Sequence, residues 1–182
     1  MLPHHTPLTY NGIIFFIGFM GCGKSRLGKK LAAKTNRPFI DLDALIEQNE
    51  GKTIAQIFSQ IGENKFRELE KTSLQNSTFP PNAIVSTGGG APCFFDNMQW
   101  MNAHGLTFFL DTPIAILASR LINGKSKRPL IEGKTQQELL NYIEIKLIER
   151  RPFYQNATIS LHQADITPEM VIDTINKKFF EH

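Results

Sequence analysis

Eight consecutive residues near the start of the chain have the composition of a phosphate-binding loop. The segment 18–25 is GFMGCGKS and matches G-x-x-x-x-G-K-[ST] at every fixed position. Glycines let the backbone wrap around phosphate oxygens with its N–H groups pointing inward, and a helix start adds partial positive charge. Lys24 would reach the β- and γ-phosphates, and the Ser25 hydroxyl could ligate Mg²⁺. A glycine-rich turn that only joined a strand to a helix would need neither side chain.

A second chemical group is a pair of carboxylates, Asp41 and Asp43, with one residue between them. The pair follows a short apolar run that is expected to be a strand, and open α/β sheets bind ligands at the carboxyl ends of their strands. One carboxylate could hold Mg²⁺ through water, and the other could bond to a substrate hydroxyl or accept its proton. The competing interpretation is that Asp43, or both residues, only cap the helix that follows.

Two loops break the regular pattern. The segment 86–92, STGGGAP, has three consecutive glycines at the edge of the sheet where a ligand is expected. A close approach of the backbone to a ligand would explain the glycines, and a plain flexible loop would explain them equally. The segment 123–134 is polar and basic and has a glycine near each end, which is typical of a lid whose cations close over a polyphosphate and exclude water. A solvated surface loop has the same composition.

Several arginines could bind a carboxylate or a phosphate through two parallel hydrogen bonds, a geometry that lysine lacks. Arg67 lies in an expected helix within one turn of Glu63 and Glu70, and Arg150 and Arg151 close a later helix. From the residues alone, surface ion pairs with Glu63 or Glu70 are the slightly favoured explanation of Arg67. The phenylalanines are expected in the core by default: Phe58, Phe66, Phe94, Phe95, Phe108 and Phe109.

These side chains need a scaffold that brings distant loops to one edge. Short apolar runs alternate with helical stretches, which predicts a parallel α/β sheet with right-handed connections. Thr53, Thr112 and Thr167 stand where they can cap helices. The expected strands are 13–17, 38–41, 83–86, 106–110 and 158–161. The expected helices are 24–35, 42–50, 53–59, 63–76, 95–103, 113–122, 135–150 and 168–180.

Length and composition narrow the class of protein. With 182 residues, 41% of them hydrophobic, the chain is expected to form one domain over 1–182. A net charge of +3 suits an anionic substrate but is too small to indicate a nucleic-acid partner. No apolar run is long enough for a membrane span, and two distant cysteines fit neither a zinc site nor a disulfide framework, so a reducing cytoplasm is expected. The expected oligomeric state is a monomer.

The ordered set of motifs resembles the shikimate kinases over nearly the whole chain, from Ile13 to about Phe180. The phosphate loop alone occurs in many unrelated proteins, so the decisive segments are FIDLD at 39–43, GENKFRELE at 62–70, STGGGAP at 86–92, KRPL at 127–130 and ERRPFY at 149–154. The resemblance implies a P-loop, three-layer α/β fold like that of nucleoside monophosphate kinases. This fold has a five-stranded parallel sheet flanked by helices, a substrate-binding segment at about 42–76 and a lid at about 123–134. The implied reaction transfers the γ-phosphoryl group of ATP to the 3-hydroxyl of shikimate, which gives shikimate 3-phosphate on the route to chorismate and aromatic amino acids.

For the nucleotide, the resemblance implies roles inside and outside the phosphate loop. Ser25 matches a magnesium ligand and Asp41 a carboxylate that holds the metal through water, so Mg²⁺ is the expected cofactor, with ATP as co-substrate. Arg120 and the region around Pro168 match residues that sandwich adenine. Arg26 departs from the Thr or Ser that is common at its position and would lose a hydroxyl contact to the α-phosphate. The implied ATP-binding residues are Gly21, Cys22, Gly23, Lys24, Ser25, Arg26, Arg120 and Arg128.

For the second substrate, the resemblance implies a carboxylate receptor beside a group that handles the hydroxyl. Asp43 matches the residue that contacts the shikimate hydroxyls and is the candidate base. Arg67, oriented by Glu70, and Arg150 match two arginines that hold the substrate carboxylate, whereas Arg151 falls where the family varies. The implied substrate-binding residues are Asp43, Phe58, Phe66, Arg67, Gly88, Gly89, Gly90 and Arg150. The implied catalytic residues are Asp43, Lys24 and the lid arginine Arg128, which would reach the transferring phosphates.

Other functions remain compatible with a phosphate loop. A gluconate-type kinase on the same fold would take a different polyol acid, and a nucleotide kinase would take a nucleoside monophosphate. A non-catalytic ATP-binding regulator would keep the loop and lose the chemistry, and would be expected to lack Asp43, Arg67, Arg128 or Arg150. All four residues are present.

Overall fold

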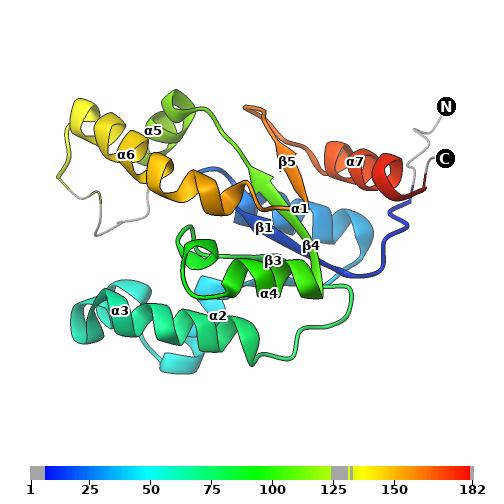
Figure 1. Ribbon diagram of the computed structural model, residues 1–182, viewed down its shortest axis with the longest axis horizontal. Coiled ribbons are helices and arrows are strands. Elements are labelled where there is room, and N and C mark those ends of the chain that lie inside the picture. Colours follow the sequence, from blue (N-terminus) through cyan, green and yellow to red (C-terminus); the bar gives the residue numbers. More distant parts are fainter. Residues whose placement is uncertain (1–6, 124–130, 132, 181–182) are drawn as a thin grey trace.

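The computed structural model describes residues 7–123, 131 and 133–180, which form a five-stranded parallel sheet flanked by helices (Figure 1). The strands are β1 (Ile13–Ile17), β2 (Phe39–Asp41), β3 (Ile84–Ser86), β4 (Gly105–Leu110) and β5 (Ile159–Leu161). Their spatial order is β2-β3-β1-β4-β5, and every neighbouring pair is parallel. The predicted fold class is confirmed.

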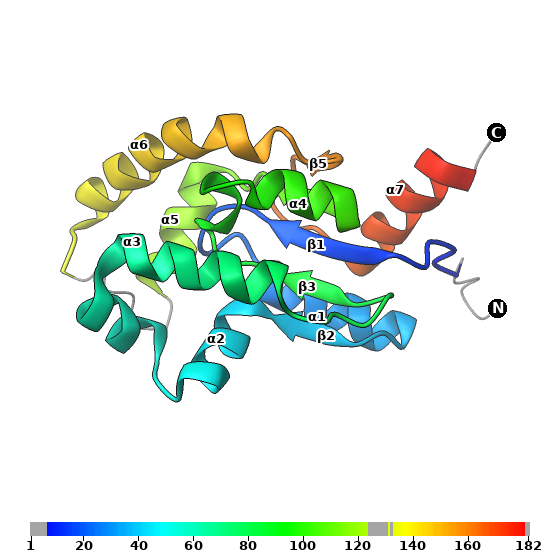
Figure 2. The same ribbon diagram turned by 60° about the horizontal axis from the view of Figure 1, so that its bottom comes forward.

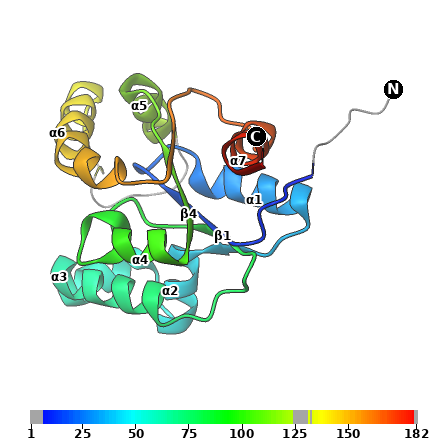
Figure 3. The same ribbon diagram turned by 45° about the vertical axis from the view of Figure 1, so that its right-hand side comes forward.

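The helices cover both faces of this sheet. Figures 1 and 3 show α1 and α7 packed together on one face and α4 on the other, with α3 beside α4. Figure 2 shows α2 and α3 on the β2 side of the sheet. No helix in the described ranges is long and apolar enough to cross a membrane. The described helices are α1 (Lys24–Thr35), α2 (Leu42–Glu50), α3 (Ile54–Gln75), the 3₁₀ turn η1 (Ala91–Cys93), α4 (Asn97–His104), α5 (Ile114–Ile122), α6 (Gln136–Tyr154) and α7 (Pro168–Phe180).

Strand register brings the predicted loops to one edge. Asp41 of β2 pairs with Ser86 of β3, which pairs with Phe16 of β1. Because these three parallel strands end level with one another, the loops that follow them leave the sheet side by side. The carboxylate pair, the glycine loop and the phosphate loop are therefore neighbours in space, although they are distant in the sequence.

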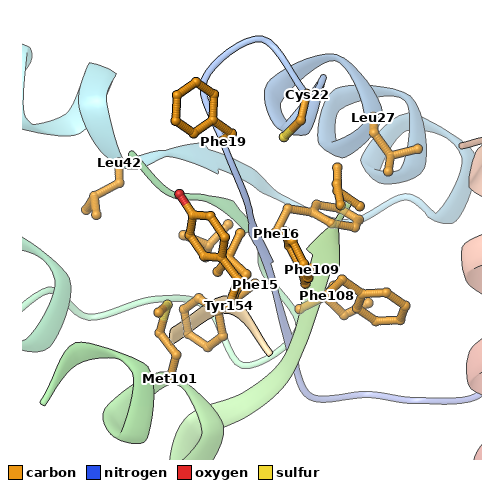
Figure 4. Packing of buried hydrophobic residues seen from close by; sticks show 14 of the residues in the cluster. Phe15, Phe16, Phe19, Cys22, Leu27, Leu42, Met101, Phe108, Phe109 and Tyr154 are labelled. Atoms are coloured by element: carbon orange, nitrogen blue, oxygen red, sulfur yellow. The ribbon is translucent and has the colours of Figure 1, made fainter. Parts of the chain in front are cut away.

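The core explains why the strands are apolar along their whole length. Side chains alternate between the two covered faces, and Phe15 and Phe16 are both fully buried. The ring centroids of Phe16 and Phe108 lie 5.8 Å apart, and those of Phe109 and Tyr154 lie 5.0 Å apart (Figure 4). Tyr154 belongs to α6, so this core fixes the end of α6 against the sheet.

The two helices expected at 53–59 and 63–76 are confirmed, and they meet at a kink. They form the single element α3, but Gly62 interrupts its helical geometry with φ 75° and ψ 173°. The first half begins at the predicted cap, Thr53, which forms a capping box with Gln56. A non-helical glycine between the two halves explains why the sequence indicated a break there.

Two helix boundaries were predicted wrongly. The helix expected to close at Arg150 continues past Pro152 to Tyr154, because Pro152 stands in its last turn and burial of Tyr154 stabilises that turn. Thr112 does not cap α5, since its hydroxyl donates to the backbone oxygen of Cys22 at 3.4 Å.

The helix expected from residue 95 starts only at Asn97. Phe95 has a positive φ of 53°, a conformation that a helix does not contain. Its side chain is 54% exposed, so the expectation that Phe95 lies in the core was also wrong.

Candidate active site

The phosphate loop joins β1 to α1 with a backbone that glycine adopts most easily. Gly18, Gly21 and Gly23 all have positive φ angles, of 137°, 82° and 100°. A Cβ at Gly18 would also lie 2.9 Å from the backbone oxygen of Leu110 in β4. Gly23 is the N-cap of α1 and provides no side-chain cap, so the first N–H groups of that helix can bind an anion.

Lys24 lies across its own loop. Its Nζ donates to the backbone oxygens of Gly18 at 2.8 Å and Phe19 at 3.0 Å, and the residue is only 8% exposed. A buried ammonium needs such partners. Phosphate oxygens would have to replace these carbonyl oxygens when a nucleotide binds, and the ammonium would gain an anionic partner.

Ser25 and Asp41 form an oxygen cluster between the phosphate loop and β2. Ser25 Oγ donates to Asp41 Oδ2 at 2.5 Å and lies 3.1 Å from Ser86 Oγ. Asp41 also caps α2, since its Oδ1 accepts a hydrogen bond from the backbone N–H of Ala44 at 3.4 Å. The interpretation that Asp43 caps the helix is therefore wrong, because Asp43 stands in the first turn of α2, and the actual cap, Asp41, also accepts a hydrogen bond from Ser25.

Two cavities open over this edge of the sheet and meet at Gly23, Arg26 and Arg120. The larger, of about 320 Å³, is bordered by the phosphate loop, both aspartates and the glycine loop. Its lining residues are Met20, Gly21, Gly23, Lys24, Ser25, Arg26, Asp41, Asp43, Thr87, Gly89 and Arg120. The smaller, of about 200 Å³, continues past Arg120 to the segment before α7. Its lining residues are Cys22, Gly23, Arg26, Leu27, Lys30, Leu110, Arg120, Ala164, Asp165, Ile166, Thr167 and Pro168.

Arg67 and Glu70 form a buried ion pair beside the larger cavity. Arg67 Nη1 donates to Glu70 Oε2 at 2.8 Å, and the two residues are 5% and 1% exposed. The explanation of Arg67 as a surface ion pair is thus wrong. Burial raises the pKa of Glu70 to about 7, against the opposing effect of Arg67, and Asp43 contributes to the rise. Burial alone would lower the pKa of Arg67, but Glu70 and Glu63 together raise it above its usual value.

Three aromatic rings surround the Arg67 guanidinium. Its Cζ lies 4.5 Å from the ring centroid of Phe94, 5.2 Å from that of Phe66 and 5.7 Å from that of Phe58. Phe58 and Phe66 were expected near the site, and the structure brings both to Arg67. Phe94 was assigned to the core, and the only signal that could have identified it is its position four residues after the glycine loop.

Each of the three glycines in the loop after β3 is required by a close approach of another group. A Cβ at Gly88 would lie 2.5 Å from Glu70 Oε1 and 2.9 Å from Asp43 Oδ1, and one at Gly90 would lie 2.6 Å from Arg67 Nη1. At Gly89 the neighbour is the phosphate loop, 3.1 Å away at the backbone nitrogen of Met20. The approach expected from a ligand is therefore made already by the protein itself, through charged side chains at Gly88 and Gly90 and through backbone at Gly89.

The second predicted carboxylate receptor, Arg150, reaches the same region from α6. It is 9% exposed, its Cζ lies 5.5 Å from the ring centroid of Phe19, and its charge lowers the pKa of Glu70. One helical turn on, the Tyr154 hydroxyl donates to the backbone oxygen of Gly89 at 2.5 Å. Tyr154 thus holds the glycine loop, a role that the sequence did not reveal because the helix was expected to end before it.

The structure therefore brings most of the predicted site residues together around the larger cavity and Arg67. Cys22 lines the smaller cavity and is buried, with Sγ 3.7 Å from Lys24 Nζ. Arg120 joins the two cavities, and its Nη1 donates to the backbone oxygen of Cys22 at 3.4 Å. Arg151 does not join the site, because it pairs with Asp111 through two hydrogen bonds of 3.0 and 3.1 Å. Arg128 and most of the expected lid at 123–134 lie outside the described residues.

Comparisons with known proteins find shikimate kinases that are similar to most of this chain. The family model of shikimate kinase matches residues 20–179. A shikimate kinase of Bacteroides fragilis is 50% identical over 144 residues, which are 79% of this chain and 80% of the relative. The crystal structure of the shikimate kinase from Bacteroides thetaiotaomicron has a TM-score of 0.85 at 40% identity, covering 92% of this chain and 97% of that one. That of Acinetobacter baumannii shikimate kinase in complex with shikimate has a TM-score of 0.79 at 29% identity, covering 92% of each chain.

Proposed function

The chain belongs to the shikimate kinase family, and we propose that it transfers the γ-phosphoryl group of ATP to the 3-hydroxyl of shikimate. The observation that carries this proposal is the position of Asp43 between two receptors. Asp43 lines the phosphate-loop cavity, and its Oδ1 faces the same Gly88 position as Glu70, the partner of Arg67. A substrate whose carboxylate binds Arg67 and Arg150 would thus present its hydroxyls to Asp43 beside the phosphates.

Phosphoryl transfer asks a protein mainly for positioning and for neutralisation of charge. Lys24 and the N–H groups at the start of α1 would bind the phosphates of ATP, and Arg128 would add a cation from the lid. Asp43 would orient the attacking hydroxyl and take its proton as the new oxygen–phosphorus bond forms, while the bond from the γ-phosphorus to the β–γ bridging oxygen breaks and ADP leaves. Arg67 and Arg150 would hold the substrate carboxylate, with Phe58 and Phe66 as apolar walls.

Magnesium fits the oxygens at the end of β2. Ser25 Oγ and Asp41 Oδ2 are hard oxygen donors 2.5 Å apart, of the kind that Mg²⁺ prefers. No group of three His, Cys, Asp or Glu side chains converges anywhere in the described ranges, which suits an ion held mainly by phosphates and water. Ser25 would hold the ion directly and Asp41 through water. When bound, the ion would neutralise charge on the phosphates of ATP.

The nucleoside would occupy the smaller cavity. Arg120 and the segment that ends at Pro168 border this cavity and would enclose adenine. Arg26 borders both cavities, so its guanidinium could approach the α-phosphate or the ribose in place of the missing hydroxyl. We propose that the protein acts as a monomer, the state expected from its moderate size. The two cysteines are free, in keeping with a reducing cytoplasm.

The test is ADP release from MgATP in four separate reactions, with shikimate, with gluconate, with a nucleoside monophosphate and without acceptor. The proposed function predicts turnover with shikimate that is lost in Arg67→Ala. Turnover with another acceptor alone would overturn the substrate assignment but keep a kinase. ATP binding without turnover in any reaction would indicate the non-catalytic regulator instead.

A further inference from the structure

On one edge of the Arg67 guanidinium, only one of the two N–H groups has a hydrogen-bond partner among the described residues. A carboxylate that approaches an arginine from the side takes two parallel hydrogen bonds, from Nε and Nη2. Nη2 donates to Glu63 Oε1 at 3.0 Å, while Nη1 donates to Glu70 Oε2 at 2.8 Å. Within the described part of the chain the buried Nε has no hydrogen-bond partner. Glu63 thus holds one N–H of the side-on edge, and the other N–H stays unsatisfied.

An unsatisfied buried N–H on a charged group is unfavourable, so a ligand that reaches it gains affinity. Arg67 is 5% exposed, and the ring centroids of Phe58, Phe66 and Phe94 lie 4.5–5.7 Å from its Cζ, so its N–H groups have few polar neighbours. A ligand with a single oxygen atom could only replace the bond that Glu63 already makes. A bidentate carboxylate would make that bond and the bond to Nε as well.

The two glutamates that contact Arg67 differ in their burial. The side chain of Glu70 is 1% exposed and that of Glu63 is 51% exposed. Breaking a buried pair leaves an uncompensated charge inside the protein, whereas a solvent-exposed carboxylate exchanges its partner for water at little cost. Glu63 is therefore the carboxylate that can leave Arg67, and Glu70 is the one that stays.

The position of Glu63 at the start of a helical segment can stabilise its carboxylate after it leaves Arg67. Glu63 directly follows Gly62, whose φ of 75° interrupts α3, so it stands at the start of the second half of this helix. Negative charge is favourable in the first turn of a helix. After leaving Arg67, the Glu63 carboxylate would remain stabilised there and in water.

We propose that Glu63 is an internal competitor for the substrate carboxylate. Its carboxylate occupies Nη2 of Arg67 in the substrate-free protein, and the shikimate carboxylate displaces it to bind Nη2 and Nε together. This inference rests on the proposed function and adds a residue that sets selectivity for a bidentate carboxylate. Glu63 acts on the binding of the acceptor and not on the phosphoryl transfer itself.

The experiment compares Glu63→Gln with Glu68→Gln, an exposed glutamate of α3 that makes the matched change of charge. Initial rates with each substrate varied in turn at a saturating concentration of the other give kcat and the KM values for shikimate and ATP, and calorimetry gives the Kd for shikimate without nucleotide. In Glu63→Gln we expect KM and Kd for shikimate to fall about two- to fivefold, the range of an exposed ion pair. We expect kcat and the KM for ATP to stay unchanged. The matched control should behave like the wild-type protein in all four quantities.

An uncharged shikimate analogue, with a hydroxymethyl group in place of the carboxylate, supplies the second readout. The Kd of this analogue should not improve in Glu63→Gln, because it does not compete for the Arg67 edge. If Glu63 instead helps to hold Arg67 in place, Glu63→Gln will have a raised KM for shikimate. A raised or an unchanged KM would overturn the inference about Glu63 and leave the proposed function standing. Absence of shikimate turnover and binding in the wild-type protein would overturn the proposed function itself.

Discussion

Ser25 Oγ donates a hydrogen bond of 2.5 Å to Asp41 Oδ2, and this contact joins the phosphate loop to the end of β2. The two residues are sixteen positions apart in the sequence and come from neighbouring parts of the site. Asp41 also caps α2 through its other oxygen, so the carboxylate is fixed in orientation before any ion arrives. A fixed acceptor of this kind can orient a water molecule of the metal shell.

Asp41→Asn should therefore raise the Mg²⁺ concentration needed for half-maximal rate by about 10- to 100-fold, the usual effect of losing a group outside the first ligand shell. The measurement is the initial rate as a function of Mg²⁺ at constant free ATP. Asp173→Asn, an exposed aspartate of α7, is the matched control and should leave the curve unchanged. An unshifted curve in Asp41→Asn would remove Asp41 from the metal site.

Asp43→Asn should lower kcat by about 10²- to 10⁴-fold, the usual contribution of a group that handles a proton in the transition state. ATP binding should survive, because Asp43 does not belong to the phosphate loop. Initial rates with shikimate and calorimetric titration with MgATP measure the two quantities. Turnover close to the wild-type value would mean that Asp43 has no part in the chemistry.

Gly90→Ala should raise the KM for shikimate by more than about tenfold, because its Cβ would lie 2.6–2.7 Å from three atoms of the Arg67 guanidinium. We also expect a loss of about 1–3 kcal/mol in the free energy of unfolding from the overpacking. Steady-state kinetics and urea denaturation measure these effects.

A double-mutant cycle on the free energy of unfolding shows whether the clash is with Arg67. In an Arg67→Ala background the added methyl group meets no guanidinium, so Gly90→Ala should lower the free energy of unfolding by less than it does in the wild-type background. Equal effects of Gly90→Ala in both backgrounds would contradict the assigned contact.

The buried Glu70 predicts a definite pH dependence of stability. Burial raises its pKa from an ordinary 4.5 to about 7, so between these pH values the folded protein binds this proton more tightly than the unfolded chain. The free energy of unfolding of the wild-type protein should therefore fall, relative to Glu70→Gln, as the pH rises from about 4.5 to about 7. Urea denaturation of both proteins across this range checks the sign, and parallel curves would mean that Glu70 keeps an ordinary pKa.

Much of the fold was readable from the sequence because local signals and tertiary packing agree. The five apolar runs became the five strands, and Thr53 capped its helix as expected. Disagreement arose where tertiary contacts outweigh local preference. Pro152 predicted a helix end, but the buried ring of Tyr154 and its bond to Gly89 stabilise one more turn.

The site was predictable in its residues but not in its contacts. Three glycines indicated a close approach, yet no local pattern reveals that the approaching groups are Glu70, Asp43 and Arg67, because these come from α2 and α3. Burial of Arg67 was equally hidden, since a charged helix with glutamates at i−4 and i+3 is typical of a solvated surface. Phe94 carried no signal beyond its apolar character.

The most direct test of the proposed function is to identify the product formed from shikimate and MgATP. Phosphorus NMR, with the coupling to the ring protons, locates the new phosphate ester. We predict a single product phosphorylated at the 3-hydroxyl, formed in equal amount to ADP and formed at least about 100-fold more slowly with Asp43→Asn. A phosphate ester on another hydroxyl, or ADP formed without any phosphorylated acceptor, would contradict the position assigned to Asp43 between the phosphate loop and Arg67.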